Sequence, residues 1–331
     1  MVTPFNELEY DEQLLRLDQV AGAALAAFDL PNASAQLAGY TNNTVYRVQD
    51  GQEVYALRLH RPGLKPLSWI QSELMWLRAL QGSGLRVPQP AADLYIGALE
   101  GAAEPIICDL LTWVTGRPAP EPDDLSLEQV RQVGAEMAHL HHHAQTYAPP
   151  VGFTRPVLDW EGLFGAESPF ASAQEADVFT AEQRMVMDAV AERVRAFMPD
   201  GALHLIHGDM VLKNILFDEN GQVGFIDFDD CAFGHIFYDL ASFLWRALST
   251  TTYPAIRAAL WEGYTHVRPA YADQFEKLEP FVAARHVASC RWIAGNTGHP
   301  AIRGKAGEII AGRVTQMKHF LQTGELWLGH A

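Results

Sequence analysis

The most informative segment of the chain is residues 206–230, which read IHGDMVLKNILFDENGQVGFIDFDD. Short apolar runs alternate here with acidic and amide side chains, and the turn-forming pair Asn220-Gly221 precedes the last apolar run. This pattern predicts short β-strands with polar residues at their ends. It is the one clear β signal in an otherwise helical second part of the chain.

The spacing of three polar residues in this segment indicates phosphoryl transfer. Asp209 is followed five positions later by Asn214, and Asp227 comes thirteen positions after that. The reaction needs one carboxylate to receive a hydroxyl proton, and oxygen ligands that hold magnesium against the nucleotide phosphates. Any one of these residues by itself is more typical of a turn or a cap, but the joint spacing favours a site.

The region after this segment, and the region just before it, show helical periodicity. Ser126 is a predicted N-cap for a helix over 127–147, in which Val130, Val133, Met137 and Leu140 recur on one face. Further helices are expected over 182–197, 238–248, 253–267, 275–294 and 306–322.

The first third of the chain has a different order of elements. A helix is expected over 11–30, a hairpin within 36–59 that turns at Asp50-Gly51, a helix over 67–80 and a buried strand over 106–114. The proline-rich stretch 116–126 is predicted to be a connector. We therefore expect an α+β protein of two lobes. Residues 1–115 are expected to form an N-lobe around an antiparallel sheet, and 116–331 a mainly helical C-lobe.

Two motifs resemble those of a known family. HGD at 207–209 followed by Asn214, and IDFDD at 226–230, resemble the H-G-D-x-x-x-x-N and I-D-F-x-D motifs of the aminoglycoside phosphotransferase and choline kinase superfamily. Within it, the chain is most similar to the bacterial stress-response Ser/Thr kinase and homoserine kinase type II branch, through TVYRV, LRLHRPG and the helix around Arg285 and Arg291. The resemblance implies a protein-kinase-like fold with ATP bound between the lobes. It also implies that 1–115 is the nucleotide-binding N-lobe and that 116–331 is the C-lobe with the catalytic loop and the acceptor site.

The resemblance also implies roles for individual residues. Asp209 is the expected catalytic base, and Asn214 and Asp227 are the expected ligands of Mg²⁺. Arg58 and Glu73 are expected to form the ion pair that orients the ATP phosphates, with Arg58 in the place where most kinases have lysine. The backbone of 111–114 is expected to receive adenine.

Several polar residues near these motifs have two open interpretations. Asp229 and Asp230 either contact the metal or cap the loop. Asp239 is expected to anchor backbone amides of the catalytic loop, and His207 to brace that loop. Arg285 and Arg291 either line the acceptor pocket or pack as long aliphatic stems with exposed charges, and they are not among the expected site residues.

The charge and the cysteine content of the chain limit the kinds of partner and compartment that we expect for the protein. The net charge of −16 disfavours nucleic acid and anionic membrane surfaces as partners. The three cysteines lack metal-site or disulfide spacing, and the acidic start does not resemble a secretory signal, so we expect a cytoplasmic protein. The predicted activity is transfer of the γ-phosphoryl group of ATP to a hydroxyl group. The acceptor is either a protein Ser/Thr or a small alcohol such as homoserine, an amino alcohol or an aminoglycoside. A nucleotide-binding regulator without turnover is the alternative.

Overall fold

The structure is a computed structural model and describes residues 3–198, 203–299 and 302–329. The chain divides into two compact units. The first contains Met1–Thr115 and Ala148–Thr154, and the second contains Gly116–Tyr147 and Arg155–Ala331. The expected boundary lies between residues 115 and 116. The structure adds that a later segment, Ala148–Thr154, also belongs to the first unit. In that segment the Thr154 amide donates to Ser72 Oγ at 2.8 Å.

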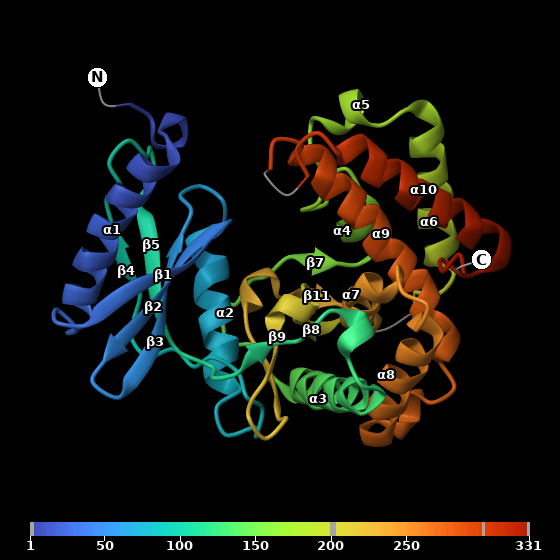
Figure 1. The fold of residues 1–331 in the computed structure, drawn as a ribbon, viewed down its shortest axis with the longest axis horizontal. Coiled ribbons are helices and arrows are strands. Elements are labelled where there is room, and N and C mark those ends of the chain that lie inside the picture. Colours follow the sequence, from blue (N-terminus) through green and yellow to red (C-terminus); the bar gives the residue numbers. More distant parts are fainter. Residues whose placement is uncertain (1–2, 199–202, 300–301, 330–331) are drawn as a thin grey trace. The chain divides into compact units, whose positions relative to one another are not determined.

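The first unit is built on an antiparallel sheet with the strand order β1-β2-β3-β5-β4. Its elements are η1 (Phe5–Glu7), α1 (Tyr10–Ala27), β1 (Ser34–Tyr40), β2 (Asn43–Asp50), β3 (Glu53–His60), α2 (Leu67–Ala79), β4 (Tyr95–Gly97) and β5 (Ile106–Thr112) (Figure 1). The predicted hairpin is the β2–β3 pair, in which Asp50 lies opposite Glu53.

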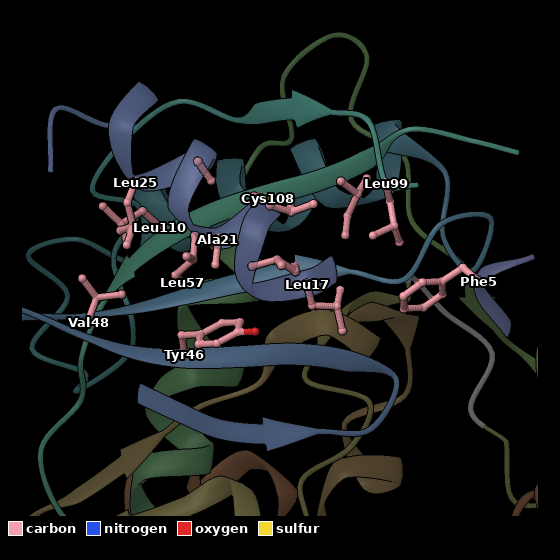
Figure 2. Close-up of a cluster of buried hydrophobic side chains, with 14 residues drawn as sticks. Phe5, Leu17, Ala21, Leu25, Tyr46, Val48, Leu57, Leu99, Cys108 and Leu110 are labelled. Carbon is pink, nitrogen blue, oxygen red and sulfur yellow. The ribbon is translucent and has the colours of Figure 1, made fainter. Parts of the chain in front are cut away.

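The core of the first unit lies between α1 and one face of this sheet. Figure 2 shows side chains of α1 and of three strands pointing toward one another; they include Leu17, Ala21, Leu25, Tyr46, Val48, Leu57, Cys108 and Leu110. Tyr46 satisfies its buried hydroxyl by donating to Asp18 Oδ1 at 2.6 Å. Because side chains alternate along a strand, Arg58 and Asp109 lie on the opposite face from Leu57 and Cys108.

The second unit is mainly helical, with two three-stranded sheets of short strands. Its elements are β6 (Arg117–Pro118), η2 (Pro122–Asp124), α3 (Leu127–Thr146), β7 (Val157–Leu158), α4 (Trp160–Phe164), α5 (Glu175–Val178), α6 (Ala181–Arg195), β8 (His204–Ile206), η3 (Leu212–Asn214), β9 (Ile215–Phe217), β10 (Val223–Phe225), η4 (Phe228–Asp230), β11 (Ala232–Gly234), α7 (Ile236–Ala247), α8 (Tyr253–Val267), η5 (Pro269–Tyr271), η6 (Phe275–Lys277), α9 (Leu278–Gly295) and α10 (Ala306–Thr323). The predicted fold class, α+β with an antiparallel sheet followed by a mainly helical part, is confirmed.

The predicted cap at the start of α3 is confirmed, whereas the stretch before it is more than a connector. Ser126 caps α3 as predicted: its Oγ accepts from the Gln129 amide at 3.2 Å, and the Gln129 side chain accepts from the Ser126 amide. The connector, by contrast, is part of a sheet. Its β6 pairs with β9, and the Ala119 amide donates to Ile215 O at 2.7 Å. A strand of two residues has no measurable periodicity, so the sequence did not show it.

Helices α3 and α8 pack closely against each other in the second unit (Figure 1). The contact has glycine on both sides. A Cβ atom at Gly134 would lie 2.2 Å from Leu260 O, and one at Gly263 would lie 2.0 Å from Arg131 O. Both opposing atoms belong to the backbone, so neither helix can accommodate a larger residue without moving.

In the part of the chain that the structure describes, no helix combines the length and the apolar character needed to cross a lipid bilayer.

Candidate active site

The catalytic loop after β8 is anchored by one buried carboxylate. Asp239, at the start of α7, accepts from the His207 amide through Oδ2 at 2.7 Å and from the Gly208 amide through Oδ1 at 2.8 Å. Gly208 has φ of 82°, and a Cβ atom there would lie 2.2 Å from Asp230 O. The glycine of the HGD motif is therefore required both by its backbone conformation and by the close approach of Asp230.

Two further side chains hold that carboxylate in place. His141 of α3 contacts Asp239 Oδ2 through Nε2 at 3.0 Å, and its Nδ1 lies 3.1 Å from the Tyr264 hydroxyl of α8. All three side chains are buried. The expectation that Asp239 anchors amides of the catalytic loop is confirmed, and the anchor itself depends on α3 and α8.

His207 joins the catalytic loop to the loop after β10. Its Nε2 lies 2.9 Å from Ile226 O, and its Nδ1 accepts from the Asp209 amide at 3.3 Å. This pattern requires the tautomer with the proton on Nε2. The ring also packs on Phe228, with 4.6 Å between centroids. His207 braces the loop, as expected from the sequence.

The two proposed metal ligands are brought together by the backbone. The Ile226 amide donates to Asn214 O at 3.0 Å, which places Asn214 beside the residue that precedes Asp227. The Asn214 amide nitrogen donates to Asp209 O at 2.9 Å and to Asp209 Oδ2 at 3.2 Å. Asn214 thus turns its nitrogen toward Asp209, and its Oδ1 is the atom suited to a cation.

Asp227 has an unusual backbone conformation. Its φ of 66° and ψ of 58° are left-handed, which is uncommon outside glycine, and its side chain is exposed. Such strain persists where the surrounding structure enforces it and is frequent at functional sites. Within the described residues no group of three His, Cys, Asp or Glu side chains forms a metal cage. A pair of oxygen ligands still fits Mg²⁺, which keeps several waters and binds substrate phosphates.

Asp209 is held by a residue that the sequence analysis left out of the site. Arg285 of α9 donates from one terminal nitrogen to Asp209 Oδ1 at 2.6 Å, and Lys213 Nζ lies 3.8 Å from Oδ2. Burial raises the pKa of Asp209, but the positive charges of Arg285 and Lys213 outweigh it, so the net pKa lies below the ordinary value. The carboxylate therefore stays ionised at neutral pH and is suited to receive a hydrogen bond from an alcohol.

The loop after Asp227 has a brace of its own. Arg155 is buried and donates to Asp229 O at 2.6 Å and to Cys231 O. The side chain of Asp229 is buried, whereas that of Asp230 is exposed. No periodicity or motif marked Arg155, because its partners are backbone carbonyls more than seventy positions later.

The first unit contains a buried ion network around Arg58. A terminal nitrogen of Arg58 lies 2.8 Å from Glu73 Oε1, which is the ion pair expected from the sequence. Asp109 accepts from Arg58 Nε at 2.9 Å and from its other terminal nitrogen at 2.7 Å, and His60 Nε2 lies 2.8 Å from Asp109 Oδ2. Burial raises the pKa of Asp109, but the charges of Arg58 and His60 reverse the effect and hold it well below the ordinary value.

This network changes the expected role of Arg58. Arg58 is expected to orient the ATP phosphates, but in the structure the bidentate edge of its guanidinium, formed by Nε and one terminal nitrogen, donates to Asp109. The reason is sheet register: Arg58 on β3 lies opposite Asp109 on β5. The pairing of Arg58 with Asp109 could not be predicted from the sequence, because the sequence does not show that β5 lies beside β3.

The expected adenine contacts are also partly occupied. The Thr112 amide donates to Gln89 O at 2.8 Å, and the Trp113 amide donates to Val54 O at 3.0 Å. These two amides of the stretch 111–114 are used within the first unit and do not serve adenine.

The chain is similar to a known protein family and to individual proteins of bacteria. A model of the phosphotransferase enzyme family matches residues 34–281. A homoserine kinase of Gluconobacter oxydans is 31% identical over 242 residues, covering 69% of this chain and 70% of the relative. An uncharacterised protein of Deinococcus radiodurans is 27% identical over 317 residues, covering 92% of this chain and 86% of its own length.

Solved structures agree with the sequence relatives. A microcompartment-associated aminopropanol kinase has a TM-score of 0.80 and 28% identity, over 93% of this chain and 99% of that structure. An amicoumacin kinase, at 15% identity and a TM-score of 0.73, shows the same fold over 97% of this chain and 98% of its own. The predicted enzyme class, a kinase with an alcohol group as acceptor, is confirmed, and the chain belongs to the phosphotransferase enzyme family.

Proposed function

We propose that this enzyme transfers the γ-phosphoryl group of ATP, in the presence of Mg²⁺, to the hydroxyl of a small alcohol of the homoserine or amino alcohol type. The observation that carries the proposal is the group formed by Asp209, Asn214 and Asp227. Asn214 donates to Asp209 O, Asp239 holds the two amides that precede Asp209, and His207 contacts the carbonyl of the residue before Asp227. The relatives support the acceptor class, since they include a homoserine kinase and an aminopropanol kinase.

In this proposal the residues of the second unit act on the acceptor. Asp209 binds the acceptor hydroxyl and orients or accepts its proton as the new P–O bond forms, while the bond between the γ-phosphorus and the β,γ-bridging oxygen of ATP breaks and ADP leaves. Asn214 Oδ1 and the Asp227 carboxylate hold Mg²⁺, which supplies positive charge to the nucleotide phosphates. Asp239 and His207 keep the backbone of the loop in position before substrate binds.

The first unit is assigned to the nucleotide. The Arg58 charge is fixed by Glu73 and Asp109, so its guanidinium keeps one orientation relative to the sheet. We propose that this fixed cation acts electrostatically on the ATP phosphates, while its bidentate edge stays on Asp109. The regulator without turnover is not favoured, because Asp209 and both proposed metal ligands are present.

A radiolabelled ATP assay tests the proposal. The acceptors are homoserine, aminopropanol, choline, an aminoglycoside and a Ser/Thr peptide, each with and without Mg²⁺. We expect Mg²⁺-dependent labelling of a small alcohol. In Asp209→Asn, turnover should fall by about 10²–10⁴-fold while ATP still binds, because the amide keeps the shape but cannot take a proton.

The matched control is Asp273→Asn, which changes an exposed carboxylate of the same unit and should leave turnover unchanged. Labelling of the peptide alone would reject the small-alcohol acceptor. Unchanged turnover in Asp209→Asn would reject the assignment of Asp209.

A further inference from the structure

The guanidinium of Arg285 is held on two sides by hydrogen bonds. One terminal nitrogen donates to Asp209 Oδ1 at 2.6 Å, and the other donates to the Tyr238 hydroxyl at 3.2 Å. The side chains of Arg285 and Asp209 are only 13% and 17% exposed, so water competes weakly for this contact. Arg285 comes from α9, 76 positions after Asp209 in the chain.

Aromatic rings restrict the same guanidinium further. Its Cζ lies 5.8 Å from the ring centroid of Tyr238 and 5.7 Å from that of Trp245, both on α7. Such contacts favour a cation over the ring face. Arg285 therefore has a fixed position relative to α7, the helix that also carries the loop anchor Asp239.

The contacts of the Asp209 carboxylate divide between its two oxygens. Oδ1 receives the short charge-assisted bond from Arg285, whereas Oδ2 has a longer bond from Asn214, at 3.2 Å, and Lys213 at 3.8 Å. Oδ2 is therefore the oxygen with capacity left for an acceptor hydroxyl. A carboxylate tied at one oxygen can rotate little, so the other oxygen keeps a defined direction.

We propose that Arg285 is a positioning residue for phosphoryl transfer: it holds Asp209 Oδ1 so that Oδ2 is aimed at the acceptor hydroxyl. The inference rests on the proposed function, in which Asp209 binds that hydroxyl. Arg285 does not touch the reacting atoms in this scheme. It acts by fixing the orientation of the Asp209 carboxylate. We call the contact between Arg285 and Asp209 Oδ1 the clamp, and Tyr238 and Trp245 hold the Arg285 guanidinium in this position.

Turnover of Arg285 variants tests the proposal. In Arg285→Ala the kcat should fall by about 10²-fold, the loss typical of a misplaced catalytic group, while the KM for MgATP changes little. Arg285→Lys should be intermediate, because lysine keeps the charge but cannot reach both Asp209 and Tyr238 in a planar fork. Added guanidinium ion should partly and saturably restore the kcat of Arg285→Ala.

Arg291→Gln is the matched control, since Arg291 is a buried arginine of the same helix. It contacts Glu175 at 2.9 Å and Gly165 O at 3.0 Å. We expect this variant to lose thermal stability without any rescue of turnover by guanidinium. A purely structural role for Arg285 would make its variants behave in the same way, and that result would overturn the proposal.

Further measurements test whether Arg285 positions Asp209. Higher turnover in Arg285→Ala would show that Arg285 blocks Asp209 rather than positioning it. The clamp itself is tested without turnover by ¹⁵N NMR of the arginine terminal nitrogens, whose slow rotation in the wild type should be lost in Asp209→Asn; free rotation in the wild type would reject it. Absence of turnover in the wild type on every acceptor would instead contradict the proposed function.

Discussion

Asp239→Asn is the most direct test of how the catalytic loop is held. The Asp239 carboxylate accepts from two backbone amides and from His141, at distances of 2.7–3.0 Å. An asparagine in the same place has one oxygen. If that oxygen takes the place of Oδ2, it keeps the bonds from His207 and His141, and the new amide group then faces the Gly208 N–H, so two donors oppose each other.

The cost of this substitution follows from the single bond that is lost. A buried donor without an acceptor destabilises a protein by about 1–3 kcal/mol. The opposite orientation of the amide would leave two donors unsatisfied, so the first orientation is preferred. Because Gly208 directly precedes Asp209, relief of the clash moves the Asp209 carboxylate. If Asp209 acts as proposed, a shift of about 1 Å corresponds to a loss of roughly 10²-fold in kcat.

Urea unfolding, turnover and amide hydrogen exchange together measure these effects. In Asp239→Asn the Gly208 amide should lose more protection than the His207 amide, since only the Gly208 bond is broken. Ser242→Ala is the control: Ser242 is buried on the same helix and bonds only within it, to Tyr238 O at 2.9 Å. It should cost about 1 kcal/mol or less and leave both loop amides protected. Equal protection of the two amides in Asp239→Asn, together with normal turnover, would refute the reasoning.

Two further predictions concern the metal and the first unit. Asp227→Ala should weaken the Mg²⁺ dependence of ATP binding, since only Asn214 would remain as a direct ligand; calorimetric titration of ATP with and without the metal checks this, and an unchanged dependence would make Asp227 a loop residue only. Asp109→Asn should destabilise the protein by about 3–5 kcal/mol, because it leaves the buried Arg58 charge partly uncompensated. The pKa of Asp109 is lowered by folding, so its stabilising effect is present above its unfolded pKa of about 4 and is lost as the pH falls below that value. The difference in urea midpoint between the wild type and Asp109→Asn should therefore shrink progressively as the pH falls below about 4, toward the lowered pKa of the folded state. A difference that does not shrink at all in acid would contradict the ion network.

The sequence was sufficient where local signals determine structure. The Ser126 cap needs only Gln129 three positions later, and the Asp50-Gly51 turn needs only the two strands beside it. The group of Asp209, Asn214 and Asp227 could also be predicted from the sequence, because its members lie within one segment of short strands. Such features depend on residues that are close in the chain.

The residues that the sequence did not reveal depend on packing between distant segments. Asp109 meets Arg58 because β5 pairs with β3, and Arg285 meets Asp209 because α9 packs against α7. Neither contact has a periodicity or a spacing that marks it in advance. An arginine on an apolar helix is equally compatible with a partly exposed charge, and only the three-dimensional packing decides between the two.

The glycines between α3 and α8 extend the requirements of the proposed site to positions far from Asp209. Gly134 and Gly263 let the two backbones meet, and the same pair of helices supplies His141 and Tyr264, which hold Asp239. An added methyl group at either glycine would separate the helices and loosen that support. A mutational library selected for turnover should therefore record Gly134 and Gly263 as intolerant to substitution, although neither residue contacts the proposed site.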